Sequence, residues 1–298
     1  MNSTMKKYSI RYAIEWLLSR KLAKSFSDSL YVRLMFYSRT GHILNLNNPK
    51  TFNEKLQWIK INDHNPLYTT IVDKVAVKEY VSKIIGSEYI VPTLGVWNDF
   101  DSIDFNHLPK QFVLKCNHDS GGLVICKDVT NFDIEKARNK INKSLQRNYY
   151  WTGREWPYKN VEPCVMAEQF LTDESEVELK DYKFFCFNGD PKFFKVDFDR
   201  FIEHHANYYD LEMKLLEFGE VICPPIKNRE IEKPKNFEKM VELAKKLSKG
   251  FPFLRVDFYN VDGKIYFGEL TLFPASGAGP FIPYSADMEL GKDLELPI

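Results

Sequence analysis

The sequence predicts an α+β fold in which helices come first and antiparallel hairpins follow. Over the first 85 residues, apolar side chains recur mainly at three- and four-residue spacing, which is the helical period. From Gln111 onward, short runs rich in aromatic and β-branched residues are separated by turn signals such as Gly189-Asp190 and Asp262-Gly263. Helices stand between hairpins instead of after every strand. This order favours α+β over a doubly wound parallel sheet.

Four helical segments are expected in the N-terminal part, and the third begins at Thr51, where Glu54 completes a capping box. Asn65-Pro66 ends that helix, and the fourth segment ends before Gly86. A short β-branched run, Glu88–Leu94, is closed by Gly95. The segments with helical spacing are Met5–Ser25, Asp28–Ser38, the segment from Thr51, and Pro66–Ile85. On the last of these, Asp73, Lys74 and Lys78 are expected to be solvated charges.

The remaining chain is expected to form mainly strands, with helices at Asn131–Arg147 and Asn236–Gly250. The expected strands are Gln111–Asn117, Gly122–Cys126, Pro163–Leu171, Asp181–Asn188, Pro191–Phe198, a pair within His204–Leu216, Leu254–Tyr259 and Lys264–Leu272. The aromatic loop Asn148–Lys159 is either a plug of the core or a lid over a ligand. The tail after Gly279 is polar and interrupted by proline.

Composition excludes some classes of function. Lys plus Arg equals Asp plus Glu at 41 each, so the chain lacks the basic excess typical of nucleic-acid binding. Five cysteines without a CxxC pattern indicate buried thiols in a reducing compartment, and hence a cytoplasmic protein. The first 18 residues interleave aromatic and basic side chains. They form either a helix packed on the protein or a peripheral contact with the inner face of a membrane.

The hairpin at residues 254–272 carries the first candidate site. Asp257 and Glu269 lie on its two strands among apolar neighbours, and Arg255 stands beside the first acid. Buried carboxylates require a cation or a donor. Two of them on paired strands are suited to Mg²⁺, which binds carboxylates, water and phosphate oxygens. An ordinary hairpin with solvated acids is the alternative.

Two further segments suggest nucleotide binding. Lys115 ends a strand and precedes the polar loop 117–122, whose backbone N–H groups could surround phosphate oxygens. A plain hairpin explains the same glycines, and no Walker motif is present. The strand that ends in Glu168-Gln169-Phe170-Leu171 could present backbone groups and an apolar wall to a purine, and acids after it could bind ribose hydroxyls, with Asp181 and Lys183 nearby in sequence.

Taken in order, these stretches resemble the ATP-grasp superfamily. The chain looks most like the teichuronopeptide-biosynthesis ligases of polysaccharide clusters, and the resemblance covers about Leu44 to Gly277. The stretches that carry it are NPKTFNEKLQW, YTTIVDKVAVKEYV, FVLKCNHDSGG, VMAEQFL, DYKFFCFNG and FPFLRVDFYNVDGKIYFGELT.

The resemblance implies two α+β subdomains that clasp ATP, preceded by N-terminal helices. The expected division is 1–95 (helices and a small N-terminal subdomain), 96–171 (small ATP-grasp subdomain with a glycine-rich flap) and 172–298 (large subdomain with the magnesium site). The implied site residues are Lys74 and Lys115 for phosphate or adenine, Ser120, Gly121 and Gly122 for the flap, Glu168 and Phe170 for adenine, Asp181 for ribose or a cation, Lys183 for phosphate, Asp257, Glu269 and Thr271 for Mg²⁺, and Arg255 for the transferred phosphoryl group.

Two departures from the family pattern matter. Many ATP-grasp enzymes have asparagine two residues after the second acid, where this chain has Thr271. Asp119 in the flap would repel phosphates unless its side chain points away.

The resemblance implies an ATP- and Mg²⁺-dependent carboxylate–amine ligase that works through an acyl phosphate. The carboxylate would belong to a uronic acid of a capsular polysaccharide or exopolysaccharide or its precursor, and the amine to an amino acid or amino alcohol. Arg154, Arg200 and His204 are candidates for the acceptor site, or else ordinary surface residues. One alternative is a glycosyltransferase, because Asp197-Phe198-Asp199 forms a DxD pattern. The other is a non-catalytic partner in polysaccharide assembly.

Overall fold

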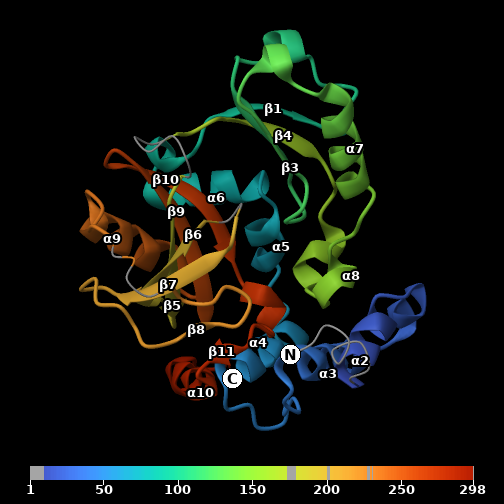
Figure 1. The fold of residues 1–298 in the computed structure, drawn as a ribbon, viewed down its shortest axis with the longest axis vertical. Coiled ribbons are helices and arrows are strands. Elements are labelled where there is room, and N and C mark those ends of the chain that lie inside the picture. Colours follow the sequence, from blue (N-terminus) through green and yellow to red (C-terminus); the bar gives the residue numbers. More distant parts are fainter. Residues whose placement is uncertain (1–9, 173–178, 200–201, 227–228, 230, 298) are drawn as a thin grey trace.

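The computed structural model describes residues 10–297 apart from 173–178, 200–201, 227–228 and 230. Two antiparallel sheets dominate it, one in the upper and one in the lower left part of Figure 1. Helices precede the sheets in the chain, and the mixed α+β prediction is confirmed. The division at residues 95 and 171 stays a prediction, and the first strand crosses residue 95.

The larger sheet has five strands in the order β10 (Lys264–Thr271), β9 (Phe253–Val261), β5 (Asp181–Phe187), β6 (Asp190–Phe198) and β7 (His205–Asp210). Two of its hairpins have two-residue loops, because Phe187 pairs with Asp190 and Val261 pairs with Lys264. All four loop residues have positive φ: 50° and 81° at 188 and 189, and 55° and 96° at 262 and 263. This backbone matches the twist of the strands, so the turn residues fix the register.

One face of the five-stranded sheet is covered by α9 (Phe237–Ser248), which packs across β5, β6 and β9. The opposite face is divided. Its lower part is aromatic, with Phe185 stacked on Phe193 at 4.9 Å and Phe253 edge-on to Phe52 at 4.9 Å. Its upper part carries charged side chains, described below. The aromatic lower half of this face is buried in the core. The charged upper half remains uncovered and is suited to contact a polar ligand.

The smaller sheet has four strands in the order β1 (Thr93–Trp97), β4 (Val165–Gln169), β2 (Phe112–Cys116) and β3 (Leu123–Cys126). Helix α7 (Ile134–Leu145) packs on β2 and β3, where Ile141 joins Phe112 and Leu114 in a separate core. Asp133 caps this helix by accepting a hydrogen bond from the Lys136 N–H at 2.9 Å. Of the β-branched run 88–94, only the last two residues belong to β1, which begins at Thr93.

The N-terminal helices α2 (Ile10–Leu18) and α3 (Asp28–Thr40) form a third, small core with the 3₁₀ turn η1 (Lys21–Ser25). Helix α3 ends at Gly41, whose φ of 80° suits glycine. Helix α2 buries none of its residues, and Ile10 and Trp16 are 66% and 52% exposed. None of the described helices reaches the length and hydropathy that crossing a bilayer requires.

The segment 66–85 forms two helices instead of the single one predicted. Helix α4 (Phe52–Asn62) starts with the predicted capping box, and α5 (Leu67–Val72) and α6 (Ala76–Ile85) follow. The break occurs because the Asp73 carboxylate accepts from the N–H groups of residues 75 and 76 and so starts α6. The backbone N–H of Lys74 is thereby released and donates to the Asn117 carbonyl oxygen at 3.0 Å. This bond ties the break to the smaller sheet.

The C-terminal tail is also more regular than predicted. It forms β11 (Phe281–Ile282) and α10 (Tyr284–Asp293), and Leu290 and Leu294 are buried. The proline at 283 precedes the helix, where it is tolerated, so it begins the helix instead of interrupting it. The remaining short elements are η2 (Ser87–Tyr89), η3 (Phe105–His107), η4 (Val129–Asn131), α8 (Tyr150–Gly153), η5 (Trp156–Asn160), β8 (Gly219–Glu220) and η6 (Pro274–Gly277).

Candidate active site

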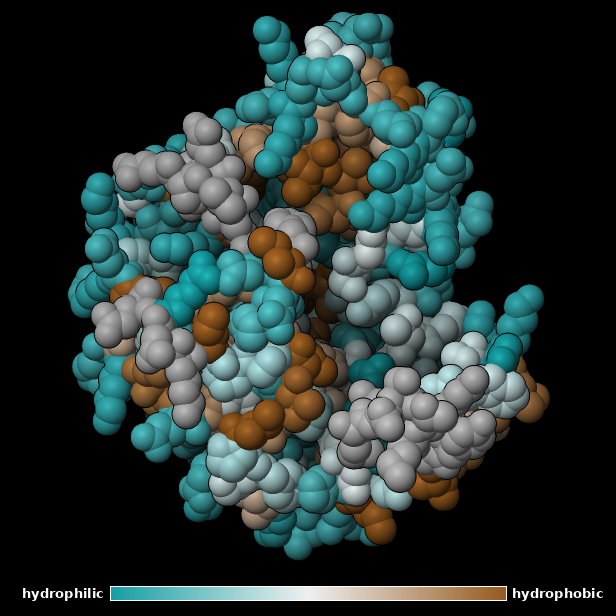
Figure 2. Space-filling model, viewed as in Figure 1, coloured by the Kyte–Doolittle hydropathy of each residue, from teal (hydrophilic) through white to brown (hydrophobic). Residues whose placement is uncertain are grey.

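A cleft of about 520 Å³ lies between the two sheets, and the junction of α5 and α6 closes one side. Figure 2 shows the molecule hollowed between its upper and lower parts. The volume is in the range of small-molecule sites. Eleven of the predicted site residues line it: Lys74, Lys115, Ser120, Gly122, Glu168, Asp181, Lys183, Arg255, Asp257, Glu269 and Thr271.

The floor of the cleft is a row of charged side chains that crosses four strands of the larger sheet. Glu269 on β10 pairs with Asp257 on β9, Asp257 pairs with Lys183 on β5, and Lys183 pairs with Lys195 on β6. Residues directly opposite one another in neighbouring strands share a face of the sheet. The strand order therefore brings the two predicted acids and the predicted lysine together.

Arg255 holds the two acids together. Its Nε and Nη2 donate to the Asp257 carboxylate at 2.7 Å each, and Nη2 also donates to Glu269 Oε1 at 2.7 Å. Thr271 Oγ1 donates to the same Glu269 oxygen at 2.9 Å. A bulge at Gly268 brings Glu269 opposite Asp257, and a Cβ there would lie 3.0 Å from the Asp257 carbonyl oxygen. A side chain at position 268 would therefore crowd the backbone of β9 at the point where the acids meet.

The two carboxylates differ in their electrostatics. Burial raises the pKa of Asp257, which is 1% exposed, although Arg255 opposes the shift. Burial acts in the same direction on Glu269, but Arg255, Lys74 and Lys183 together outweigh it and lower its pKa. Asp257 is therefore no solvated hairpin acid, whereas the Glu269 side chain is 45% exposed.

The donor set fits Mg²⁺. It offers two carboxylates and a hydroxyl, all of them oxygen ligands, and Glu269 Oε2 accepts no hydrogen bond from a described residue. Asp257 accepts from Arg255 with both oxygens, but each carboxylate oxygen has a second lone pair. Arg255 and a cation can therefore share the acids.

Lys183 extends from β5 between two further acids. Its Nζ lies 3.3 Å from Asp181 Oδ2 and contacts Asp197 Oδ2 more closely. Burial would lower the pKa of this lysine, but Asp181 and Asp197 outweigh burial and raise it. Lys183 is therefore charged at neutral pH, as a phosphate ligand must be.

The roof of the cleft centres on Glu168 of β4. Its two carboxylate oxygens accept from Lys78 Nζ at 2.6 Å and Lys115 Nζ at 2.5 Å. Burial would lower the pKa of Lys115, but Glu168 outweighs it and the pKa rises. Lys78 and Lys74 face the cleft, so their prediction as solvated charges is wrong. The prediction assumed one continuous helix over residues 66–85. Because the helix breaks at residues 73–75, these two side chains point in other directions than that helix would give them.

The glycine loop differs from the predicted phosphate cradle. Asp119 is buried, and its Oδ1 accepts from the N–H groups of Gly121 at 3.2 Å and Gly122 at 2.8 Å. Its other oxygen accepts from Arg147 at 2.8 Å and from Ser144. Asp119 lines the cleft, but its carboxylate is occupied by the loop N–H groups, Ser144 and Arg147. The two glycine N–H groups bind that carboxylate in this structure, and Gly121 does not line the cleft.

Several predicted site residues lie elsewhere. Phe170 is half-buried and does not line the cleft. Arg154 is buried against the N-terminal helices, where it donates to the Ala23 carbonyl oxygen at 2.8 Å and contacts Asp28 at 3.2 Å, so its role as an acceptor-site residue is not supported. Arg200 lies outside the described residues.

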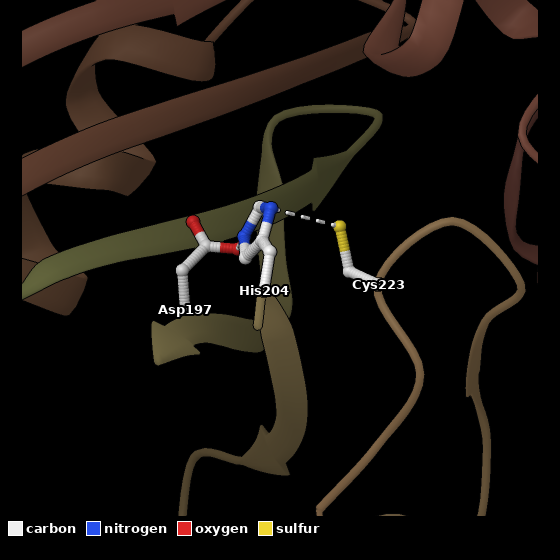
Figure 3. A group of neighbouring side chains, drawn as sticks. All are labelled: Asp197, His204 and Cys223. Carbon is white, nitrogen blue, oxygen red and sulfur yellow. Dashed lines mark hydrogen bonds and ion pairs between the residues drawn. The ribbon is translucent and has the colours of Figure 1, made fainter. Parts of the chain in front are cut away.

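The third acceptor candidate, His204, belongs to a different cluster beside the cleft (Figure 3). Its Nε2 lies 3.0 Å from Asp197 Oδ1 and its Nδ1 lies 3.5 Å from Cys223 Sγ. Among the described residues, this is the group of three whose ligand atoms all lie within 4.8 Å of one another. Because the imidazole uses opposite nitrogens toward its neighbours and Lys183 already neutralises Asp197, the group forms a hydrogen-bonded chain instead of a chelate.

The same contacts bear on the DxD pattern. Asp197 contacts Lys183, whereas Asp199 adopts a φ of 54° and pairs with Arg229. The two acids therefore do not converge on one point in this structure.

The cleft is also lined by residues that the sequence does not identify as site residues, among them Arg39, Tyr149, Glu155 and Tyr158. Tyr149, Glu155 and Tyr158 come from the aromatic loop. This loop packs into the protein and also lines the cleft: Tyr150 and Pro157 are buried, while Tyr149 and Tyr158 face the cleft. Glu155 is buried and accepts from Ser276 Oγ at 2.5 Å. Its position depends on a contact 121 residues away, so no local sequence signal could have revealed it.

Comparison with known proteins agrees with this geometry. The chain belongs to the TupA-like ATP-grasp family, whose family model matches residues 54–295. This assignment confirms the predicted superfamily and the ATP-grasp fold. No curated protein sequence matches the chain.

Solved structures similar to this chain include three ATP-grasp enzymes. An N5-carboxyaminoimidazole ribonucleotide synthetase in complex with ADP is 16% identical over 73% of this chain and 50% of that one, with a TM-score of 0.45. The D-alanine–D-alanine ligase of Helicobacter pylori is 15% identical over 76% and 61%, with a TM-score of 0.41. The ATP-grasp ligase PsnB with its minimal precursor is 10% identical over 74% and 59%, with a TM-score of 0.40. The chain thus spans less than two thirds of these relatives.

Proposed function

We propose that this protein is an ATP- and Mg²⁺-dependent carboxylate–amine ligase. The observation that carries the proposal is the convergence of Asp257, Glu269 and Arg255 in one cleft, opposite Lys74 and Lys115. Phosphoryl transfer depends on positioning and on charge neutralisation more than on a protein nucleophile. A cleft that offers cations and metal ligands from both sides meets this need.

The nucleotide is proposed to lie between the two sheets. Lys74, Lys115 and Lys183 bind phosphate oxygens as charged donors. Asp257, Glu269 and Thr271 hold the metal, and a cation bound there would neutralise charge on the phosphates. Apolar side chains that line the cleft, such as Val77 and Phe267, provide a wall for the base. Glu168 has two lysines on its oxygens, so it orients those lysines at least as much as it contacts adenine.

The proposed reaction has two steps. A carboxylate oxygen of the first substrate attacks the γ-phosphorus of ATP, the bond to the β,γ-bridging oxygen breaks, and ADP leaves. The amine nitrogen of the second substrate then attacks the acyl carbon, and inorganic phosphate leaves with the bonding electron pair. The nitrogen loses a proton, and an amide remains. Arg255 stabilises the negative charge on the transferred group, as preorganised donors do.

The proposed substrates are those implied by the resemblance to the ligases of polysaccharide clusters. We propose a uronic acid of a capsular polysaccharide or exopolysaccharide, or of its precursor, as the carboxylate, and an amino acid or amino alcohol as the amine. We also propose a cytoplasmic enzyme that contacts the inner membrane face through α2 and η1, supported by the exposed Ile10, Tyr12 and Trp16 on α2 and the exposed Leu22 on η1.

The test measures ADP release with Mg-ATP across a panel of uronic acids paired with amines. ADP release that requires both a uronic acid and an amine, with amide formation confirmed by mass spectrometry, is the expected result. Thermal stabilisation by UDP- or GDP-sugars without stabilisation by Mg-ATP would reject the ligase and favour a glycosyltransferase. A complete failure to bind millimolar Mg-ATP would favour the non-catalytic partner.

A further inference from the structure

A second hollow of about 700 Å³ adjoins the cleft. It lies between the N-terminal helices and the segment that joins α7 to α8, in the lower right part of Figure 1. Arg39 and Thr152 line both spaces, so the hollow opens on the proposed site of phosphoryl transfer.

The lining of this hollow is strongly basic. Glu15 is its single acidic residue among those described, and its basic residues are Arg20, Lys21, Lys24, Arg39, Arg147 and Arg154. Two of the six are neutralised, Arg147 by Asp119 at 2.8 Å and Arg154 by Asp28 at 3.2 Å. In the described part of the chain, no carboxylate forms an ion pair with the other four. A concave surface with several uncompensated charges of one sign concentrates ligands of the opposite sign.

Arg39 occupies the junction between the two spaces. Its one hydrogen bond to a described acceptor runs from Nη1 to the Ala275 carbonyl oxygen at 3.4 Å. Ala275 follows Thr271 by four residues, so Arg39 stands at the end of the strand that carries Glu269. Most donors of this guanidinium remain available, and a guanidinium matches a carboxylate in a bidentate geometry.

We propose that the hollow binds an oligosaccharide with several carboxylates and that Arg39 holds the carboxylate that is to be activated. The inference rests on the proposed ligase function and narrows its substrate from a single sugar acid to a chain of uronic acids. A monocarboxylate would use Arg39 alone. Arg20, Lys21 and Lys24 on the turn after α2 would then have no anion to bind. Trp151, which is half-buried in the wall, lies within cation–π distance of Lys24 and Arg154, at 5.0 Å and 4.6 Å from its ring, and so positions two of the positive charges in the lining.

The test is calorimetric titration of the full chain with Mg-ADP present, using trigalacturonate, galacturonate and neutral maltotriose. Trigalacturonate should bind at least tenfold more tightly than galacturonate, and maltotriose should not bind. The triple variant R20Q/K21Q/K24Q removes exposed charges that contact no core residue. It should weaken trigalacturonate roughly ten- to a hundredfold and leave galacturonate unchanged. Arg39→Gln should weaken both ligands by the same factor.

A charge-matched variant provides the control. K239Q/K245Q/K246Q removes three exposed positive charges from α9, far from the hollow in Figure 1, and should bind trigalacturonate like the wild type. Equal losses in the two triple variants would overturn the proposal, as would equal binding of galacturonate and trigalacturonate. Tighter binding of tripolyphosphate than of trigalacturonate would overturn the saccharide assignment. Mg-ATP binding, measured in the same proteins, distinguishes failure of the ligase proposal from failure of the inference about the hollow. If Mg-ATP does not bind, the ligase function is rejected. If Mg-ATP binds but trigalacturonate does not, only the role of the hollow is rejected.

Discussion

Replacing Asp257 by asparagine tests the proposed centre most directly. The substitution keeps the size of the side chain and removes one negative charge from between Arg255 and Lys183. Loss of one electrostatic contact that stabilises a transition state lowers the rate by about 10²–10³. This corresponds to about 3–4 kcal/mol in the barrier at 1.36 kcal/mol per decade.

The same structure predicts a smaller effect on folding. Removal of one partner from a buried ion pair costs about 3–5 kcal/mol when the other charge is left alone. Here Arg255 keeps Glu269 at 2.7 Å, and the asparagine oxygen can still accept one hydrogen bond. We therefore expect the unfolding free energy of the variant to fall by about 1–3 kcal/mol, so the protein stays folded at 25 °C.

The assay is ADP release coupled to NADH oxidation, with urea unfolding measured in parallel. Asp262→Asn is the matched control, because it is the same change in the same hairpin, at an exposed turn position whose φ of 55° suits asparagine. The control should keep wild-type activity. Full activity in Asp257→Asn with Mg-ATP would refute the metal assignment. If the variant loses both its activity and its folded state, unfolding explains the loss of activity.

Three further changes follow from the structure. Glu168→Gln leaves Lys78 and Lys115 without their shared carboxylate and should lower the unfolding free energy by about 3 kcal/mol at pH 7. Burial would raise the pKa of Glu168, but Lys115 and Lys78 outweigh it and lower the pKa. The stabilisation is therefore fully present above pH ~4.3, the unfolded value, and is lost progressively as the pH falls from there through the lowered folded pKa, so urea unfolding should show a smaller difference between the two proteins at pH 3.5 than at pH 7. Burial raises the pKa of the Cys164 thiol to about 11, so iodoacetamide labelling at this residue, followed by mass spectrometry, should accelerate about tenfold per pH unit between pH 7 and 10; a flat profile would contradict it. Trp16→Ser should reduce co-sedimentation with phosphatidylglycerol vesicles several-fold while ADP release in solution is unchanged, and equal co-sedimentation would reject the membrane contact.

The local parts of the site could be predicted from the sequence. Asp-Gly at 262–263 fixes a two-residue turn, and alternation along β9 places Arg255 and Asp257 on one face, but Glu269 joins them only through the bulge at Gly268, which alternation does not predict. The capping box at Thr51 and the cap at Asp133 are equally local. Each depends on residues within a few positions of one another.

The parts that depend on packing could not be predicted. Lys195 joins the charged row only because β6 lies next to β5, and Arg39 reaches the cleft from a helix 236 residues before its partner Ala275. The break before α6 has no glycine or proline to announce it, since Asp73 uses its side chain to start a new helix. The glycine loop was misjudged for a similar reason, because Asp119 takes the N–H groups that a phosphate cradle would need.

The bridge formed by Arg255 has a consequence for the catalytic cycle. Two carboxylates on adjacent strands would repel each other whenever product and cation depart together, and the hairpin would splay. Because the positively charged Arg255 guanidinium lies between the two carboxylates, it offsets their repulsion throughout the catalytic cycle. The enzyme can therefore rest between turnovers with its shape intact, and a new nucleotide meets a centre that needs no reassembly.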